Sequence, residues 1–134
     1  MTPGLSGVLT IFYYRNLAAA AEWYARALGF ECVRREEGLV LFRVNREAML
    51  ALVGDGHGSQ RPIEGRQKGA ILSLQTDNLD GWHAHLTARG VVDDTSIHPG
   101  YGGRTREFKL FDPEGYTVEF FEWLPRSEAV DARR

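Results

Sequence analysis

The first half of the chain consists of short apolar runs around one amphipathic segment. Residues 8–14 (VLTIFYY) are β-branched and aromatic, which is typical of a strand. Residues 17–30 follow the N-cap residue Asn16 and combine high alanine content with an apolar face at helical spacing, which predicts a helix. Further apolar runs predict strands at 31–37, 39–44 and 48–53.

A Gly-rich polar segment, residues 54–68, precedes a second half with the same order of patterns. Residues 70–76 predict a strand, and residues 79–90 predict a helix that begins after the cap residue Asn78. The rest of this half predicts a strand at 91–98, a loop at 98–103, and a hairpin of strands 104–111 and 116–123 around the turn Asp112–Gly115.

The order β-α-β-β-β therefore occurs twice, which indicates an internal repeat. Sliding one half over the other matches Asn16 with Asn78 and Gly29 with Gly90. We expect an α+β fold of two tandem βαβββ modules that form a cup-shaped, mostly antiparallel curved sheet with helices outside. The single domain, 1–134, would contain module 1 at about 6–53, a linker at 54–68, module 2 at about 69–124 and a polar tail at 125–134.

Composition narrows the class of protein. The net charge of −2 is spread along the chain, without the basic stripe of a nucleic-acid binder. No apolar run is long enough to span a membrane, so we expect a soluble, cytoplasmic protein without a membrane partner. The single cysteine, Cys32, excludes a disulfide framework and a thiolate-rich zinc site, and its strand-like setting predicts a buried thiol.

Two stretches carry a family resemblance: FYYRNLAAAAEWYARALGFE near the start and REFKLFDPEGYTVEFFEW near the end. Together they resemble the vicinal oxygen chelate superfamily, which includes glyoxalase I, bleomycin-resistance proteins, fosfomycin-inactivating transferases and extradiol dioxygenases. The resemblance covers about residues 6–124. It implies a cup whose centre holds a divalent metal in the enzymes, with ligands from the first and last strands of each half.

Only one of the implied ligand positions holds a metal-binding side chain. Glu119 matches the final position, whereas the others hold Leu9, Leu52 and Ile71. A stable site needs about three protein oxygen or nitrogen ligands. We therefore expect no cofactor and no stoichiometric metal, and the resemblance is nearest to the metal-free, bleomycin-resistance-like branch.

Strand alternation suggests what surrounds Glu119. Its face would include Thr117 and Phe121, and pairing Phe111 with Tyr116 would bring Phe108 and Arg106 alongside. We expect the carboxylate to be largely buried against Arg106, Tyr13, Gln75 or a ligand; a purely structural pair with Arg106 or Arg104 is the alternative. The candidate ligand-binding residues are Ile11, Tyr13, Ser73, Gln75, Tyr101, Arg106, Phe108, Glu119 and Phe121.

Two functions fit this reading. The first is a homodimeric binding protein whose apolar cup takes a small organic molecule, aromatic or antibiotic-like, as in antibiotic resistance. The second is a lyase, isomerase or dioxygenase-type enzyme of the same superfamily, in which Glu119 is a metal ligand or a general acid or base. In a metal-free enzyme, Arg106 or Tyr13 would position an oxyanion.

Overall fold

A computed structural model describes residues 1–92 and 96–125. Contacts divide the chain into two units, which are described separately below. Unit 1 contains residues 1–68 together with the turn Asp112–Gly115, and unit 2 contains Gly69–Phe111 and the chain from Tyr116 onward. Each unit has one four-stranded sheet and one α-helix, which confirms the α+β fold of two tandem βαβββ modules.

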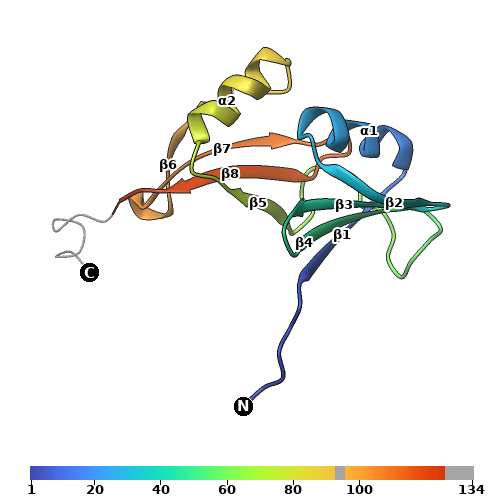
Figure 1. Ribbon diagram of the computed structural model, residues 1–134. Coiled ribbons are helices and arrows are strands. Elements are labelled where there is room, and N and C mark those ends of the chain that lie inside the picture. Colours follow the sequence, from blue (N-terminus) through green and yellow to red (C-terminus); the bar gives the residue numbers. More distant parts are fainter. Residues whose placement is uncertain (93–95, 126–134) are drawn as a thin grey trace. The chain divides into compact units, whose positions relative to one another are not determined.

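Unit 1 builds its sheet in the order β1-β4-β3-β2. The parallel pair of β1 and β4 brings the start and end of the module together, and the other neighbours are antiparallel. The helix α1 lies along one face of this sheet in Figure 1. The elements are β1 (Val8–Tyr14), α1 (Leu17–Ala27), β2 (Glu31–Glu36), β3 (Leu39–Asn45) and β4 (Ala48–Gly54).

Alternation along these strands separates a packed face from an open one. Phe12 and Tyr14 are buried beneath α1, whereas Leu9 and Ile11 are exposed on the other face. Leu52 pairs with Phe12 and is fully buried, so it lies on the helix side. Its expected place among the open-face ligand positions was therefore wrong. The open-face residue is Ala51, which pairs with Ile11.

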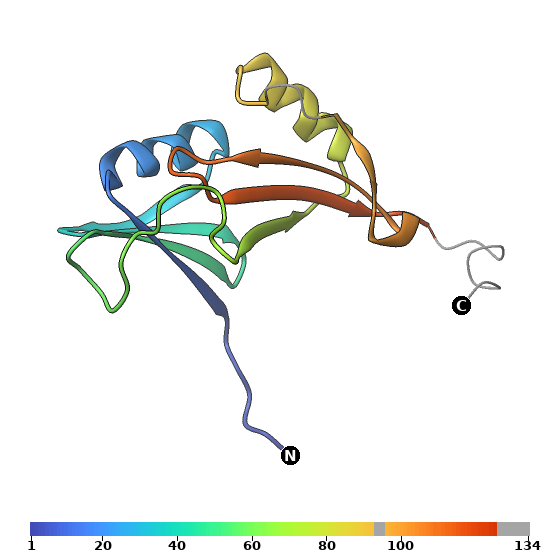
Figure 2. The same cartoon turned by 180° about the vertical axis from the view of Figure 1, so that it is seen from behind.

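Unit 2 repeats this arrangement, with sheet order β5-β8-β7-β6 and a parallel pair of β5 and β8. Both views show α2 along β7 and β8 (Figures 1 and 2). The side chain of Asn78 accepts from the N–H of Gly81 and caps this helix. The elements are β5 (Ile71–Gln75), α2 (Leu79–Ala88), β6 (His98–Gly100), the 3₁₀ turn η1 (Tyr101–Gly103), β7 (Thr105–Phe111) and β8 (Thr117–Trp123).

Three expectations about secondary structure and burial need correction or fall outside the described chain. The edge strand lies at His98–Gly100, where a loop was expected, while residues 93–95 of the expected strand 91–98 lie outside the described residues. The expected polar tail also lies outside the described residues from residue 126 onward. Cys32 is exposed rather than buried, because β2 is an edge strand with every residue exposed. Within the described residues, no helix is long and apolar enough to cross a membrane.

The β7–β8 hairpin has a different register from the expected one. Phe111 pairs with Thr117, so the connection holds residues 112–116, one more than expected. Glu119 consequently faces Lys109, and Phe121 faces Glu107. Because side chains alternate between the two faces, a shift of one residue moves every β7 side chain to the other face.

The turn Asp112–Gly115 is anchored within unit 1. The Asp112 carboxylate, only 5% exposed, accepts hydrogen bonds from the hydroxyls of Tyr14 and Tyr24. Burial, followed by the neighbouring Tyr24 and Asp112, raises the pKa of Tyr14 far above its ordinary value, so its hydroxyl stays a donor. The sequence motif Asp-Pro-Glu-Gly therefore has a structural role in this chain.

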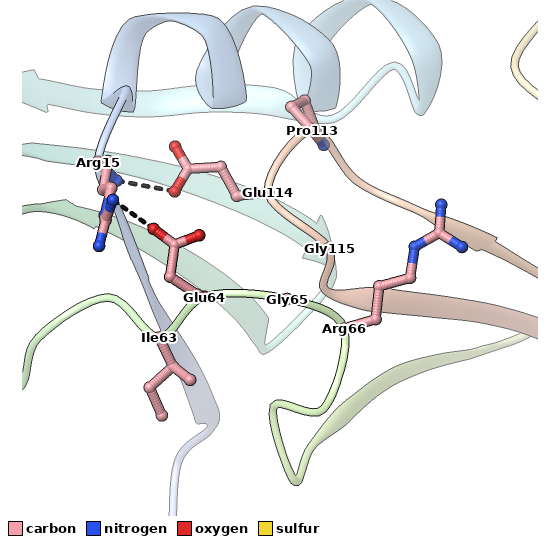
Figure 3. A pocket seen from close by; sticks show the side chains of 8 residues that line it. All are labelled: Arg15, Ile63, Glu64, Gly65, Arg66, Pro113, Glu114 and Gly115. Atoms are coloured by element: carbon pink, nitrogen blue, oxygen red, sulfur yellow. Dashed lines mark hydrogen bonds and ion pairs between the residues drawn. The ribbon is translucent and has the colours of Figure 1, made fainter.

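Glu114 extends the same anchor to the start of α1. Its carboxylate accepts from the backbone N–H groups of Arg15 at 2.8 Å and Asn16 at 2.7 Å. Figure 3 shows Glu114 and Glu64 both directed toward Arg15, whose guanidinium pairs with Glu64. These residues line a pocket of about 470 Å³. Its carboxylates already hold backbone and Arg15 in place, so we assign it a structural role.

Candidate ligand-binding site

The open face of unit 2, on the side away from α2, carries the chemistry. Ile71, Ser73 and Gln75 alternate with the packed residue Leu72 on β5, and Glu119 alternates with the buried Val118 and Phe120 on β8. The parallel register places Ser73 directly beside Glu119. The expected orientation of Glu119, shared with Thr117 and Phe121, is therefore what the structure shows.

Glu119 has two partners on this face. The Ser73 hydroxyl donates to its carboxylate at 2.6 Å, and the Lys109 ammonium lies 3.6 Å away. Its side chain is 16% exposed, and these partners replace the expected ones, Arg106, Tyr13 or Gln75. A mostly buried carboxylate needs such compensation, and here a hydroxyl and an ammonium supply it.

A second carboxylate, Glu107, lies close by and was missed by the sequence reading. Its side chain is 14% exposed, and Lys109 approaches it to 3.4 Å. The Thr105 hydroxyl lies 3.3 Å from Glu107, and the His98 imidazole lies 3.7 Å away across the β6–β7 pair. In the observed register Lys109 pairs with Glu119. Glu107 is two residues from Lys109 on β7, so both side chains lie on the same face of the sheet as Glu119.

Aromatic rings form the other side of this site. The Trp123 ring meets the Tyr101 ring at 5.9 Å and the Phe121 ring at 5.5 Å, both edge to face. Tyr101 has a φ of 46° and is 65% exposed; within the described residues it is the sole non-glycine residue with positive φ. Such backbone strain costs about 1–3 kcal/mol and is commonest where binding requires it. Trp123 was not among the expected site residues.

These groups line one open pocket of about 280 Å³, which we call the Glu119 pocket. Its size lies near the lower end of small-molecule sites, and its lining mixes aromatic and acidic groups as such sites do. Four of the expected binding residues line it: Ser73, Tyr101, Glu119 and Phe121. The lining is completed by Thr105, Glu107 and Trp123.

Arg106 and Phe108 lie on the other face of the hairpin from Glu119. Phe108 is fully buried and stacks on Phe120 at 5.2 Å. Arg106 pairs with Asp80 at 2.9 Å and Glu122 at 2.8 Å, and these hydrogen bonds raise its pKa. Their expected place beside Glu119 followed from the wrong register, and here they attach α2 to the sheet.

The remaining expected residues lie outside the pocket lining. Gln75 is exposed on the open face of β5. Ile11 and Tyr13 belong to unit 1, where the backbone N–H of Ser59 donates to the Tyr13 hydroxyl at 3.1 Å. That hydrogen bond lowers the pKa of Tyr13. Their role in binding stays a prediction.

The residues around Glu119 do not fit the divalent metal that the superfamily's enzymes use. Across residues 1–92 and 96–125, no three His, Cys, Asp or Glu side chains gather closely enough to hold an ion. Leu9 and Ile71 do lie on open faces, but alkyl side chains cannot coordinate a metal. Glu119 already faces the Lys109 ammonium. No chemical step through a metal follows from this arrangement.

Comparison with known proteins agrees with the fold. The model of the Glyoxalase/Bleomycin resistance protein/Dioxygenase superfamily matches residues 8–120. No curated protein sequence gives a significant match. Solved structures with the same fold include a lactoylglutathione lyase from Agrobacterium tumefaciens, with 22% identity, a TM-score of 0.72, and coverage of 90% of this chain and 96% of that one.

Two further solved structures are similar over most of the chain. A glyoxalase/bleomycin resistance protein/dioxygenase from Nocardioides has 20% identity, a TM-score of 0.76, and coverage of 95% of this chain and 88% of that one. TnmS3, an antibiotic binding protein from Streptomyces sp. CB03234, has 19% identity, a TM-score of 0.71, and coverage of 92% and 100%. These identities establish the fold alone. On the family match over most of its length, the chain belongs to the Glyoxalase/Bleomycin resistance protein/Dioxygenase superfamily.

Proposed function

We propose that this protein binds a small organic molecule, aromatic or antibiotic-like, in the Glu119 pocket without a metal ion. The observation that carries the proposal is the composition of the pocket: three aromatic rings and two mostly buried carboxylates converge on one hollow. Aromatic rings supply contact area at low entropic cost, and a few polar groups fix the orientation of the ligand.

Two further observations support binding over metal-dependent catalysis. Glu119 is engaged by Ser73 and Lys109, and the neighbouring side chains do not supply a metal-ligand set. TnmS3, which has the same fold, is an antibiotic binding protein. We carry that activity to this chain as part of the proposal, because fold alone does not determine function in this superfamily.

The first experiment screens planar aromatic compounds, including antibiotics, by quenching of tryptophan fluorescence after treatment of the protein with EDTA. We expect a ligand that binds equally well before and after chelation. Replacing Trp123 by leucine should weaken its binding about 10-fold or more, since a stacked ring contributes roughly 1–3 kcal/mol. Isothermal titration calorimetry measures this change, because the variant lacks the tryptophan that lines the pocket.

The matched control is Phe111→Leu, because Phe111 is an exposed aromatic of the same hairpin outside the pocket lining. Equal losses in both variants, or binding that disappears with EDTA, would contradict the proposal. Mass spectrometry of the recovered ligand separates the two functions. An unchanged ligand supports binding, and a converted one supports the enzyme alternative with Glu119 as acid or base.

The proposal includes a homodimer. Both sheets expose apolar side chains on their open faces, among them Leu9, Ile11 and Ile71. Burying such groups against a second chain would be favourable. Light scattering at micromolar concentration should return about twice the 15.1 kDa of one chain, whereas a value equal to one chain would contradict this part of the proposal.

A further inference from the structure

We propose that the ligand of the Glu119 pocket is an aromatic cation, and that Lys109 controls its affinity by competing for the same two carboxylates. This inference rests on the proposed function, because it names the class of ligand for that pocket. It starts from an imbalance of charge among residues that the hairpin register brings together.

The charged residues that line the pocket are Glu107 and Glu119. The nearest ammonium group, on Lys109, lies between them at 3.4 and 3.6 Å, but Lys109 itself does not line the pocket. One ammonium cannot neutralise two carboxylates. The Arg104 guanidinium lies over the Tyr101 ring and forms no ion pair with either of them, so the paired groups keep a net negative charge at the pocket. Because both side chains are mostly buried, that charge is less screened by water than a surface carboxylate would be.

The other polar groups at the carboxylates do not remove this imbalance. Ser73 and Thr105 offer neutral hydroxyls. His98 approaches Glu107 at 3.7 Å, and its imidazole adds a positive charge only when it is protonated. With a neutral imidazole, the pocket favours a positively charged nitrogen and disfavours an anionic ligand.

The aromatic lining attracts the same kind of ligand. Aromatic ring faces attract cations, most strongly those of tryptophan. The pocket already shows this preference, since the Arg104 guanidinium lies 4.9 Å from the centre of the Tyr101 ring. A flat ligand with a charged nitrogen could place its ring against Trp123 or Phe121 and its nitrogen toward the carboxylates. A neutral aromatic molecule would use only the first of these contacts.

Because the Lys109 ammonium lies close to both carboxylates, a variant that removes this ammonium tests whether it competes with the ligand. Lys109→Met keeps a long, flexible side chain but removes the ammonium, which leaves both pocket carboxylates available to the ligand. If Lys109 competes with a cationic ligand, its removal should tighten binding. If Lys109 instead contacts the ligand, its removal should weaken binding. The two roles therefore predict opposite signs.

The experiment titrates the protein with 9-aminoacridine, a planar cation, and with acridine, which is neutral at pH 8, and follows dye fluorescence. We expect wild-type protein to bind 9-aminoacridine about 10-fold more tightly than acridine. Lys109→Met should tighten 9-aminoacridine binding about 10-fold and change acridine binding less than about 3-fold, and Glu107→Gln should weaken 9-aminoacridine binding about 10-fold. Lys68→Met is the matched control, since Lys68 is the other lysine of the chain and forms no ion pair with Glu107 or Glu119.

Each other outcome overturns the inference in a recognisable way. Equal binding of the two dyes to wild-type protein would reject the cation while leaving an aromatic binding pocket. Weaker binding of both dyes to Lys109→Met, with an unchanged thermal unfolding midpoint, would make Lys109 a ligand contact. Absence of 9-aminoacridine binding to Lys109→Met would also reject the cation. The proposed function itself is tested separately, by the wider ligand screen, its EDTA comparison and the Trp123→Leu variant.

Discussion

Asp112→Ala is expected to lower the free energy of unfolding by roughly 3 kcal/mol or more, one of the two largest effects among our predictions. The Asp112 carboxylate accepts hydrogen bonds from the hydroxyls of Tyr14 and Tyr24, and all three side chains are buried. Alanine would leave two buried donors without this acceptor, and each costs about 1–3 kcal/mol. Urea denaturation followed by circular dichroism measures the change.

Two controls separate this network from a general effect of removing a carboxylate. Asp80→Ala removes an acidic side chain that is 72% exposed and paired with Arg106, and it should cost less than about 1 kcal/mol. Tyr24→Phe in the Asp112→Ala background should cost less than in wild type, because the donor has already lost its acceptor. A loss below about 1 kcal/mol for Asp112→Ala would show that the network contributes little.

Gly115→Ala is expected to lower the free energy of unfolding by about 3 kcal/mol. Gly115 has a φ of +96°, which is unfavourable for a residue with a Cβ, and a Cβ there would lie 2.4 Å from the carbonyl oxygen of Gly65. That oxygen belongs to the backbone, so it cannot turn away as a flexible side chain could. Both the backbone strain and the collision therefore contribute.

Gly29→Ala isolates the collision from the strain. Gly29 has a similar φ of +70°, but nothing lies within 4 Å of the position of its Cβ. Alanine there should cost only about 1 kcal/mol. The difference between the two variants, measured in the same urea titrations, gives the contribution of the contact with Gly65. Equal losses of unfolding free energy at the two glycines would mean that the backbone around Gly65 moves aside without cost.

These two effects bear on the site because the turn connects the two strands whose register builds the pocket. Asp112 and Glu114 bind partners in unit 1, and the strand ladder resumes only at Thr117. Had the ladder resumed at Tyr116, Glu107 and Lys109 would point away from Glu119. The contacts of the turn and the composition of the pocket are therefore connected through the register of one hairpin.

The sequence by itself determined the elements and their repetition. Apolar alternation located the strands at 8–14 and 39–44 to within a residue, and the caps at Asn16 and Asn78 marked the starts of both helices. Alternation also placed Glu119 on the open face with Phe121. These features depend on residues close together in the chain, so local propensity and periodicity are enough to predict them.

The tertiary structure alone decided which residues meet Glu119. A four-residue turn and a five-residue connection both fit the sequence around Asp112. The structure has the longer one, in which Asp112 accepts hydrogen bonds from the buried hydroxyls of Tyr14 and Tyr24, 98 and 88 residues earlier. That choice exchanged Arg106 and Phe108 for Glu107 and Lys109 on the open face. Pairing between strands depends on contacts remote in sequence, and a difference of one residue reverses every side chain. For this reason the pocket followed from the fold and not from the pattern along the chain.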